Sequence, residues 1–299
     1  MRELKRAPVA QFPPDSPATI QRMRMKHTLA VAFAAAAAVL LSVSSTHAQL
    51  APRIDPKIEV APHRAVYQMT LASAKSSSGI VSASGVLAFE WGDSCDGWTV
   101  AQRYKIVLVA SQPGSVEIAT SYATWESKDG LKYRFKSRKT RDGKAEEEVS
   151  GEARLPEAGK PGKADFTLPQ KQTMNLPAGT VFPTEHTLVL MARALAGDTV
   201  VRRVVFDGAT ADGPAEVNAL VGRKLAIGQA GVEKLVDHPG WNIRMAYFSL
   251  DKTTASEPDY EISMELQDNG IARGLKLDYA DFSIKGTLEK VELLPKPAC

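Results

Sequence analysis

Cys95 and Cys299, the two cysteines of the chain, are the residues with the greatest capacity for chemistry. In an oxidising compartment, two cysteines in one domain most simply form a disulfide. Here it would close a loop of about 205 residues and pin the C-terminal tail. The alternative is a catalytic Cys95 thiolate, which requires a nearby cation, imidazole or helix N-terminus. Asp93 and Asp96 instead oppose ionisation of the thiol, so we favour the disulfide.

The histidines beyond residue 48 are His63, His186 and His238, and they are far apart in the sequence. The chain has no H-E-x-x-H, C-x-x-C or G-x-S-x-G pattern and no phosphate-binding loop. We therefore expect no metal, no cofactor and no catalytic residues. His186 is expected in the first turn of a helix, where positive charge is disfavoured. We interpret it as a structural residue, with a neutral pocket-lining group and a catalytic base as alternatives.

The first 48 residues indicate a cleavable export signal. Arg22, Arg24 and Lys26 form a basic region, an apolar run follows at residues 29–43, and small residues end at Ala48. This order is typical of a secretory signal peptide, and an apolar run of about 15 residues is short for a membrane span. An uncleaved anchor is the alternative. We predict a leader over 1–48, a flexible mature N-terminus over 49–60, and a periplasmic location.

The charge balance depends on this leader. Its removal takes away six basic and two acidic residues, which leaves 31 basic and 32 acidic residues from the original 37 and 34. A near-neutral chain gives no electrostatic reason to expect nucleic-acid binding. No later segment is apolar enough to span a bilayer. Because the Pro-rich residues 1–21 do not resemble a signal, we expect translation to start at Met23 or Met25.

Short β-rich segments separated by turns dominate residues 61–299. Recurrent Asp-Gly and Asn-Gly dipeptides, at residues 96–97, 129–130, 142–143, 207–208, 212–213 and 269–270, are typical of tight hairpins. They predict a mainly β, antiparallel fold. We expect one domain over 61–299, because the clearest loop, 156–163, is too short for a linker. Strands are expected at 64–72, 79–91, 98–110, 116–126, 131–138, 200–206, 216–227, 241–250, 260–266, 274–279 and 282–294.

One segment predicts a helix, capped by Thr184 and ended by Gly197. Its apolar stripe consists of Leu188, Met191, Ala192 and Leu195. A lone helix in a long antiparallel sheet is expected on the concave face. This predicts a single curved sheet, a β-spiral or half-barrel, around one helix. The side chains expected to line its pocket and bind a ligand are Phe182, His186, Met191 and Leu195.

The basic segment 132–141 could bind nucleic acid or anionic lipid. However, the Asp142-Gly143 turn returns the chain into three glutamates at 146–148. A two-residue turn would place Lys139 opposite Glu146, so the charges should neutralise each other locally. By the same register Arg138 should face Glu147. We therefore expect a solvated hairpin.

Four motifs resemble the family of the cell envelope integrity protein EipB, periplasmic proteins of alphaproteobacteria. They are APHRAVY at 61–67, CDGW at 95–98, FPTEHT at 182–187 and FDG at 206–208. Together with both cysteines they cover essentially all of 61–299. The resemblance implies a spiralled sheet around a helix, similar to periplasmic lipoprotein carriers, and a Cys95–Cys299 disulfide. It also implies a role in envelope integrity and stress resistance, a link to a periplasmic tetratricopeptide-repeat protein, and no known catalytic residues.

Three functions remain open at this point. We favour a non-enzymatic envelope factor that binds a peptide, a lipoprotein segment or a lipid in a concave apolar pocket. The second is an interaction scaffold for a periplasmic repeat protein, which would dock through a sheet edge or surface. The third is a cell-wall hydrolase or transpeptidase that uses Cys95, and this function requires a free thiol.

Overall fold

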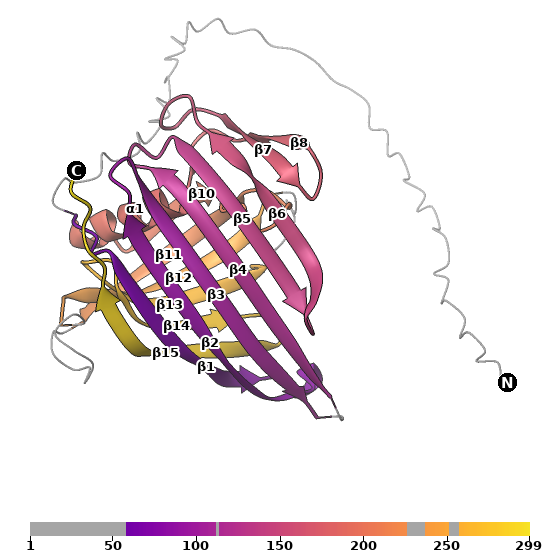
Figure 1. Ribbon diagram of the computed structural model, residues 1–299. Coiled ribbons are helices and arrows are strands. Elements are labelled where there is room, and N and C mark those ends of the chain that lie inside the picture. Colours follow the sequence, from indigo (N-terminus) through magenta and orange to yellow (C-terminus); the bar gives the residue numbers. More distant parts are fainter. Residues whose placement is uncertain (1–57, 112–113, 226–236, 251–256) are drawn as a thin grey trace, which may run out of the picture. The chain divides into compact units, whose positions relative to one another are not determined.

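Alternating apolar and polar residues build one long antiparallel sheet (Figure 1). The computed structural model describes residues 58–111, 114–225, 237–250 and 257–299, and everything below concerns the unit His47–Cys299. The predicted leader and start site lie outside the described residues, as does most of the predicted mature N-terminus. The elements are β1 (His63–Ala74), η1 (Ser76–Ser78), β2 (Ile80–Asp93), β3 (Gly97–Ala110), β4 (Ser115–Ser127), β5 (Lys132–Arg141), β6 (Lys144–Arg154), β7 (Gly162–Leu168), β8 (Gln172–Leu176), β9 (Thr180–Val181), α1 (Pro183–Leu195), β10 (Val200–Val205), β11 (Ala215–Leu225), β12 (Gly240–Ser249), β13 (Tyr260–Gln267), β14 (Ala272–Asp278) and β15 (Phe282–Leu293).

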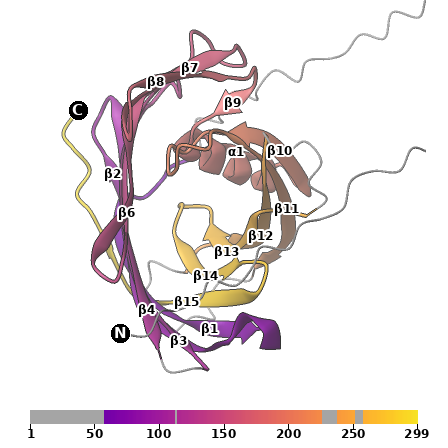
Figure 2. The same ribbon diagram turned by 90° about the vertical axis from the view of Figure 1, so that its right-hand side faces the viewer.

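The sheet curls until its two ends come together (Figure 2). Strand order runs from β8 down to β1, crosses to β15, and continues down to β9. The join between β1 and β15 is antiparallel, whereas the short β9 pairs parallel with β10. The end strands β8 and β9 are consecutive in the chain and meet at residues 177–179, which we call the seam. The predicted curved sheet is therefore confirmed, and its curvature nearly closes a barrel.

Helix α1 lies inside the curved sheet and packs on β10 and β11 (Figure 2). Val189, Leu190 and Met191 join the core formed by β10–β13, while Leu188 packs on the other side with Trp91. A helix that is apolar on most sides is one that is enclosed. The apolar stripe predicted for this helix is wrong at its last residue, because the Leu195 side chain is 51% exposed.

The β5–β6 hairpin has the predicted two-residue turn, with Asp142 and Gly143 both at positive φ. The predicted register is wrong, because a β-bulge after Lys139 shifts the pairing by one residue and sets Lys139 opposite Glu147. Arg138 likewise faces Glu148 rather than Glu147, and their side chains form an ion pair with N–O 2.9 Å. Lys139 still reaches Glu146 diagonally at 3.0 Å. The expected local neutralisation is thus present.

Eleven predicted strands correspond to observed ones, and the strands not predicted are β6 to β9. The predicted strand 216–227 extends past residue 225 into residues outside the described part. Among the described residues, no helix has the length and apolar character needed to cross a membrane. The described residues also contain no group of three His, Cys, Asp or Glu side chains placed to hold a metal ion.

Candidate functional site

A carboxylate from a distant strand holds the start of α1. The backbone N–H groups of Thr184 and Glu185 donate to the two carboxylate oxygens of Glu126, each at 2.8 Å. Glu126 is the second-last residue of β4 and is 1% exposed. The first N–H groups of a helix have no partner within the helix, so an outside acceptor is needed. The predicted cap is therefore wrong: Thr184 lies inside the helix, and the N-cap residue is Phe182, which has no acceptor side chain.

An aromatic cluster fixes the chain on both sides of α1. The Phe182 ring stacks on Tyr133 with centroids 4.9 Å apart, and Phe206 meets Tyr133 edge-on. The hydroxyl groups of Tyr122 and Tyr133 both donate to the backbone carbonyl of Asp207, at 2.5 and 2.7 Å. The turn after β10 is therefore fastened to β4 and β5. Two of the motifs, at 182–187 and 206–208, thus hold α1 in place.

Several buried titratable groups surround the first turn of α1. Burial raises the pKa of Glu126 to about 8, although its two amide hydrogen bonds act in the opposite direction. Burial also raises the pKa of Glu185 to about 7, against the attraction of Arg203. For His186, burial and then Arg203 lower the pKa to about 4, so the ring is neutral at neutral pH. Its Nε2 atom is buried without a hydrogen-bond partner among the described residues.

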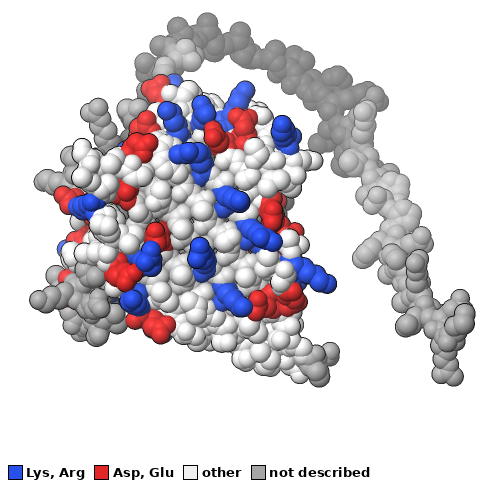
Figure 3. Space-filling view, viewed as in Figure 1, with Lys and Arg blue, Asp and Glu red and all other residues white. Residues whose placement is uncertain are grey.

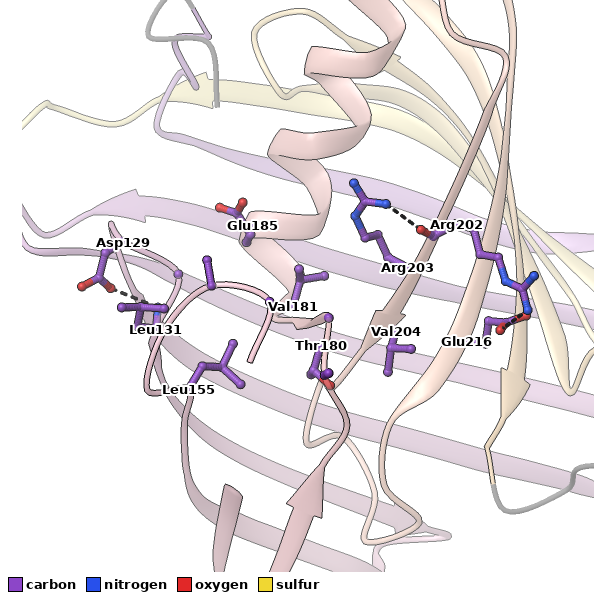
Figure 4. Close-up of a pocket in the computed structure, with 15 residues that line it drawn as sticks. Asp129, Leu131, Leu155, Thr180, Val181, Glu185, Arg202, Arg203, Val204 and Glu216 are labelled. Carbon is purple, nitrogen blue, oxygen red and sulfur yellow. Dashed lines mark hydrogen bonds and ion pairs between the residues drawn. The ribbon is translucent and has the colours of Figure 1, made fainter. Parts of the chain in front are cut away.

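A pocket of about 260 Å³ opens beside the seam (Figure 4). Its charged lining residues are Asp129, Glu185, Arg202, Arg203 and Glu216, and Figure 4 shows Glu185 on α1 facing the side where Arg203 lies. Arg203 donates to the backbone carbonyl of Arg202 at 2.7 Å. The apolar lining side chains are Leu131, Leu155, Val181 and Val204. The pocket could therefore hold a small apolar group with a polar end.

The inner face of the sheet, which carries the core side chains, also carries tyrosines that the core does not fully cover. Burial raises the pKa of Tyr260, and Tyr247, Tyr279, Tyr122 and the Asp207 carboxylate raise it further. These groups come from β4, β12, β13 and two turns, so they approach one another across the interior. Tyr247 and Tyr260 stack with centroids 4.5 Å apart.

Three phenols on this inner face have no hydrogen-bond partner among the described residues: Tyr104, Tyr260 and Tyr279. Tyr104 and Tyr260 are half-buried, and Tyr279 is 41% exposed. Half-buried apolar side chains that pack against the core lie on the same face, including Leu108, Ile118, Ile262 and Leu277. The inner face thus offers apolar contact area together with free hydroxyl groups.

Three of the four residues predicted to bind a ligand have packing positions, and Leu195 is exposed. Phe182 and Met191 are 0% exposed and His186 is 4% exposed, and none of them lines the seam pocket. Leu195 borders a surface hollow at the far end of α1. The structure therefore gives the first three a role in holding α1, and their direct contact with a ligand stays a prediction.

The predicted Cys95–Cys299 disulfide is confirmed, with Cα atoms 5.8 Å apart. Cys95 has φ 65° in the β2–β3 turn, where its N–H donates to Asp93 Oδ1 at 2.9 Å. The bond ties the C-terminal tail to this turn. Because both sulfurs are in the bond, the chain has no free thiol to act as the nucleophile of the third candidate function.

Sequence reasoning missed Glu126, Tyr122, Asp207 and Arg203. One signal was present: the helix begins at Phe182-Pro183, which provides no capping side chain, so an acceptor from elsewhere was required. For Arg203, an arginine among the valines of β10 was a second signal. No local pattern indicates that Tyr122 and Tyr133 meet the Asp207 carbonyl, since 74 or more residues separate them from it.

A nearly closed antiparallel sheet around a helix defines a barrel-like protein. The chain belongs to the EipB-like family, whose family model matches residues 55–295. It is 32% identical over 244 residues to the cell envelope integrity protein EipB of Brucella abortus (strain 2308), over 79% of this chain and 85% of that protein. A crystal structure of a beta-barrel-like protein of a domain of unknown function from Brucella abortus matches with a TM-score of 0.74. The identity is 29%, and the match covers 80% of this chain and 100% of the other.

Proposed function

We propose that this protein is a non-catalytic periplasmic factor that supports the cell envelope by binding a peptide, a lipoprotein segment or a lipid against the inner face of its sheet. The observation that carries the proposal is the set of partly exposed inner-face tyrosines with free hydroxyl groups, Tyr104, Tyr260 and Tyr279. The name of the Brucella relative supports the envelope role.

The composition of the inner face suits a largely apolar ligand with a few polar groups. Sites for apolar ligands are mostly apolar and aromatic, with a few polar groups that set the orientation of the ligand. Tyrosine provides both, because its ring contributes contact area and its hydroxyl group bonds to a carbonyl or headgroup oxygen. The seam pocket adds Leu131, Leu155, Val181 and Val204 together with charged groups that could bind the polar end of such a ligand. An extended, largely apolar ligand with occasional polar groups fits this surface best.

Photo-crosslinking in cells tests the proposal. A benzoylphenylalanine at Tyr104 replaces one inner-face aromatic residue with another, and the same residue at the exposed Gln68 of β1 is the matched outer-face control. We expect lipid or peptide adducts from position 104 and none of these from position 68. The proposal would be contradicted if both positions gave the same adducts. It would also be contradicted if position 104 gave no adducts and an apolar dye mixed with the protein showed no gain in fluorescence.

An interaction scaffold is the second candidate. One dominant protein adduct from position 68, and none from position 104, would favour docking of a periplasmic repeat protein on the outer surface over ligand binding inside the sheet.

A further inference from the structure

The outer face of the long wall, formed by β2 to β5, contains a trough of about 540 Å³. The trough runs along β4, where the outward side chains are small: Ala119 and Ser121 form its floor. Long cationic side chains rise from the neighbouring strands, Arg103 and Lys105 on β3 and Arg138 on β5. Because the side chains on β4 are small and those on the neighbouring β3 and β5 are long, they leave a channel one strand wide.

The cations of the trough are only partly neutralised. Arg103 forms no ion pair with any described residue. Lys105 pairs with Glu117 and Arg138 with Glu148, but the four side chains are 37% to 63% exposed. Exposed pairs of this kind contribute little and exchange partners readily. Figure 3 shows blue side chains across the middle of this wall and red ones toward its margins.

The spacing of these cations indicates which anion would fit. Arg103, Ser121 and Arg138 lie in one row across the three strands. Across the trough, β3 and β5 are two strand spacings apart, roughly 9–10 Å. Along β3, Arg103 and Lys105 are two residues apart, a distance of roughly 6.6–6.8 Å. An extended peptide with an acidic residue at every second position repeats its carboxylates at this same distance.

We propose that the trough over β4 docks an extended acidic segment of a partner protein, with carboxylates at alternating positions facing Arg103, Lys105 and Arg138. The cations of the trough favour an acidic occupant, and its width favours an extended segment. An extended chain can reach the floor at Ala119 and Ser121 in a channel one strand wide, whereas a planar membrane surface can contact only the tips of the cations beside it. The trough lies on the side of these strands opposite the inner face, so a partner and an inner ligand can be bound together.

Fluorescence anisotropy with the exported, disulfide-bonded protein tests this proposal. The probe is a dye-labelled peptide of alternating Glu and Thr, compared with alternating Lys and Thr and with a peptide of the same composition in two blocks. We expect binding of the alternating acidic peptide at low salt, at least about tenfold weaker binding of the block peptide, and no binding of the lysine peptide.

Two variants locate the binding. The double variant Arg103→Gln/Arg138→Gln should weaken binding by about tenfold or more, equivalent to about 1.4 kcal/mol. The matched control, Lys163→Gln/Lys171→Gln, removes the same charge from exposed positions near β7 and β8 and should change binding less than twofold. Ser121→Phe fills the floor without changing charge and should also weaken binding.

Three results would overturn the proposal. The first is equal loss in the two double variants, which would indicate general charge attraction. The second is equal affinity for the block and alternating peptides. The third is sedimentation with phosphatidylglycerol vesicles, but not with phosphatidylcholine vesicles, without any peptide binding, which would identify a membrane surface as the partner. Circular dichroism of each variant checks that the sheet is intact.

Discussion

Replacing Glu126 should release the start of α1. The carboxylate accepts from two buried N–H groups at 2.8 Å. In Glu126→Ala both lose their partner, at about 1–3 kcal/mol for each unsatisfied group. In Glu126→Gln one acceptor oxygen remains and the amide NH₂ faces the other N–H, so the loss is about 1–3 kcal/mol. Urea unfolding of the oxidised protein measures both, and Glu289→Gln, an exposed acid, is the control.

The pH dependence provides a second, independent readout of Glu126. Its pKa is about 8 in the folded protein against an ordinary value of 4.5, so between these values the folded state binds more protons than the unfolded state. Stability therefore falls as pH rises through this window. Integrated from pH 6.5 to 8, the loss is on the order of 1–2 kcal/mol. The lowered pKa of His186 acts in the opposite direction, but only below its ordinary value of 6.5.

Urea unfolding of wild type and Glu126→Gln across this pH range tests whether Glu126 holds the start of α1. Wild type should lose stability from pH 6.5 to 8, and Glu126→Gln should show a shallower slope, to which the raised pKa values of Glu185 and Asp207 contribute. If Glu126→Gln unfolds at the same urea concentration as wild type, with the same slope, Glu126 does not hold the helix as described.

Two further predictions concern the turns. Removing the disulfide with Cys95→Ser/Cys299→Ser should lower the free energy of unfolding by at most about 5 kcal/mol, because the two cysteines are 204 positions apart. Reductant should have no effect on the stability of this variant. Equal urea midpoints of oxidised wild type and variant would contradict a stabilising role of the disulfide. Gly208→Ala should destabilise by about 2 kcal/mol or more, since φ is +61° and the new Cβ would lie 2.4 Å from the Phe135 ring. Gly159→Ala is the control, because φ is +82° and the space around the new Cβ is open, so backbone strain alone should lower the stability by about 1 kcal/mol. Equal losses of stability for the two variants in thermal melts would refute the clash with Phe135.

Local patterns predicted the local features of this fold well. The helix at 183–195 follows from its apolar spacing, and the strands follow from alternation and turn dipeptides. These signals span only a few residues. The bulge after Lys139 has no such signature, because it depends on how β5 and β6 twist together, and it displaced the predicted pairs of Arg138 and Lys139 by one position.

Features that depend on distant contacts could not be predicted in this way. The acceptor for the N-terminus of α1 is Glu126, 58 residues before Thr184, and sequence reasoning placed the cap on Thr184 itself. The ligand-binding prediction for Met191 assumed one apolar stripe that faces a pocket. Because the sheet encloses the helix, Phe182 and Met191 are both 0% exposed, and contact of either side chain with a ligand stays a prediction.

The pairing of β1 with β15 has a consequence for how the chain acquires its structure during synthesis. The ribosome makes β1 early, yet its second neighbour is the last strand of the sheet, with register partners such as His63 and Leu293 separated by most of the domain. Until β15 emerges, one side of β1 presents unpaired backbone groups that could join strands of other chains. An incomplete chain of this protein therefore exposes this edge until the last strand is present, unlike a barrel whose early strands pair only with their sequence neighbours.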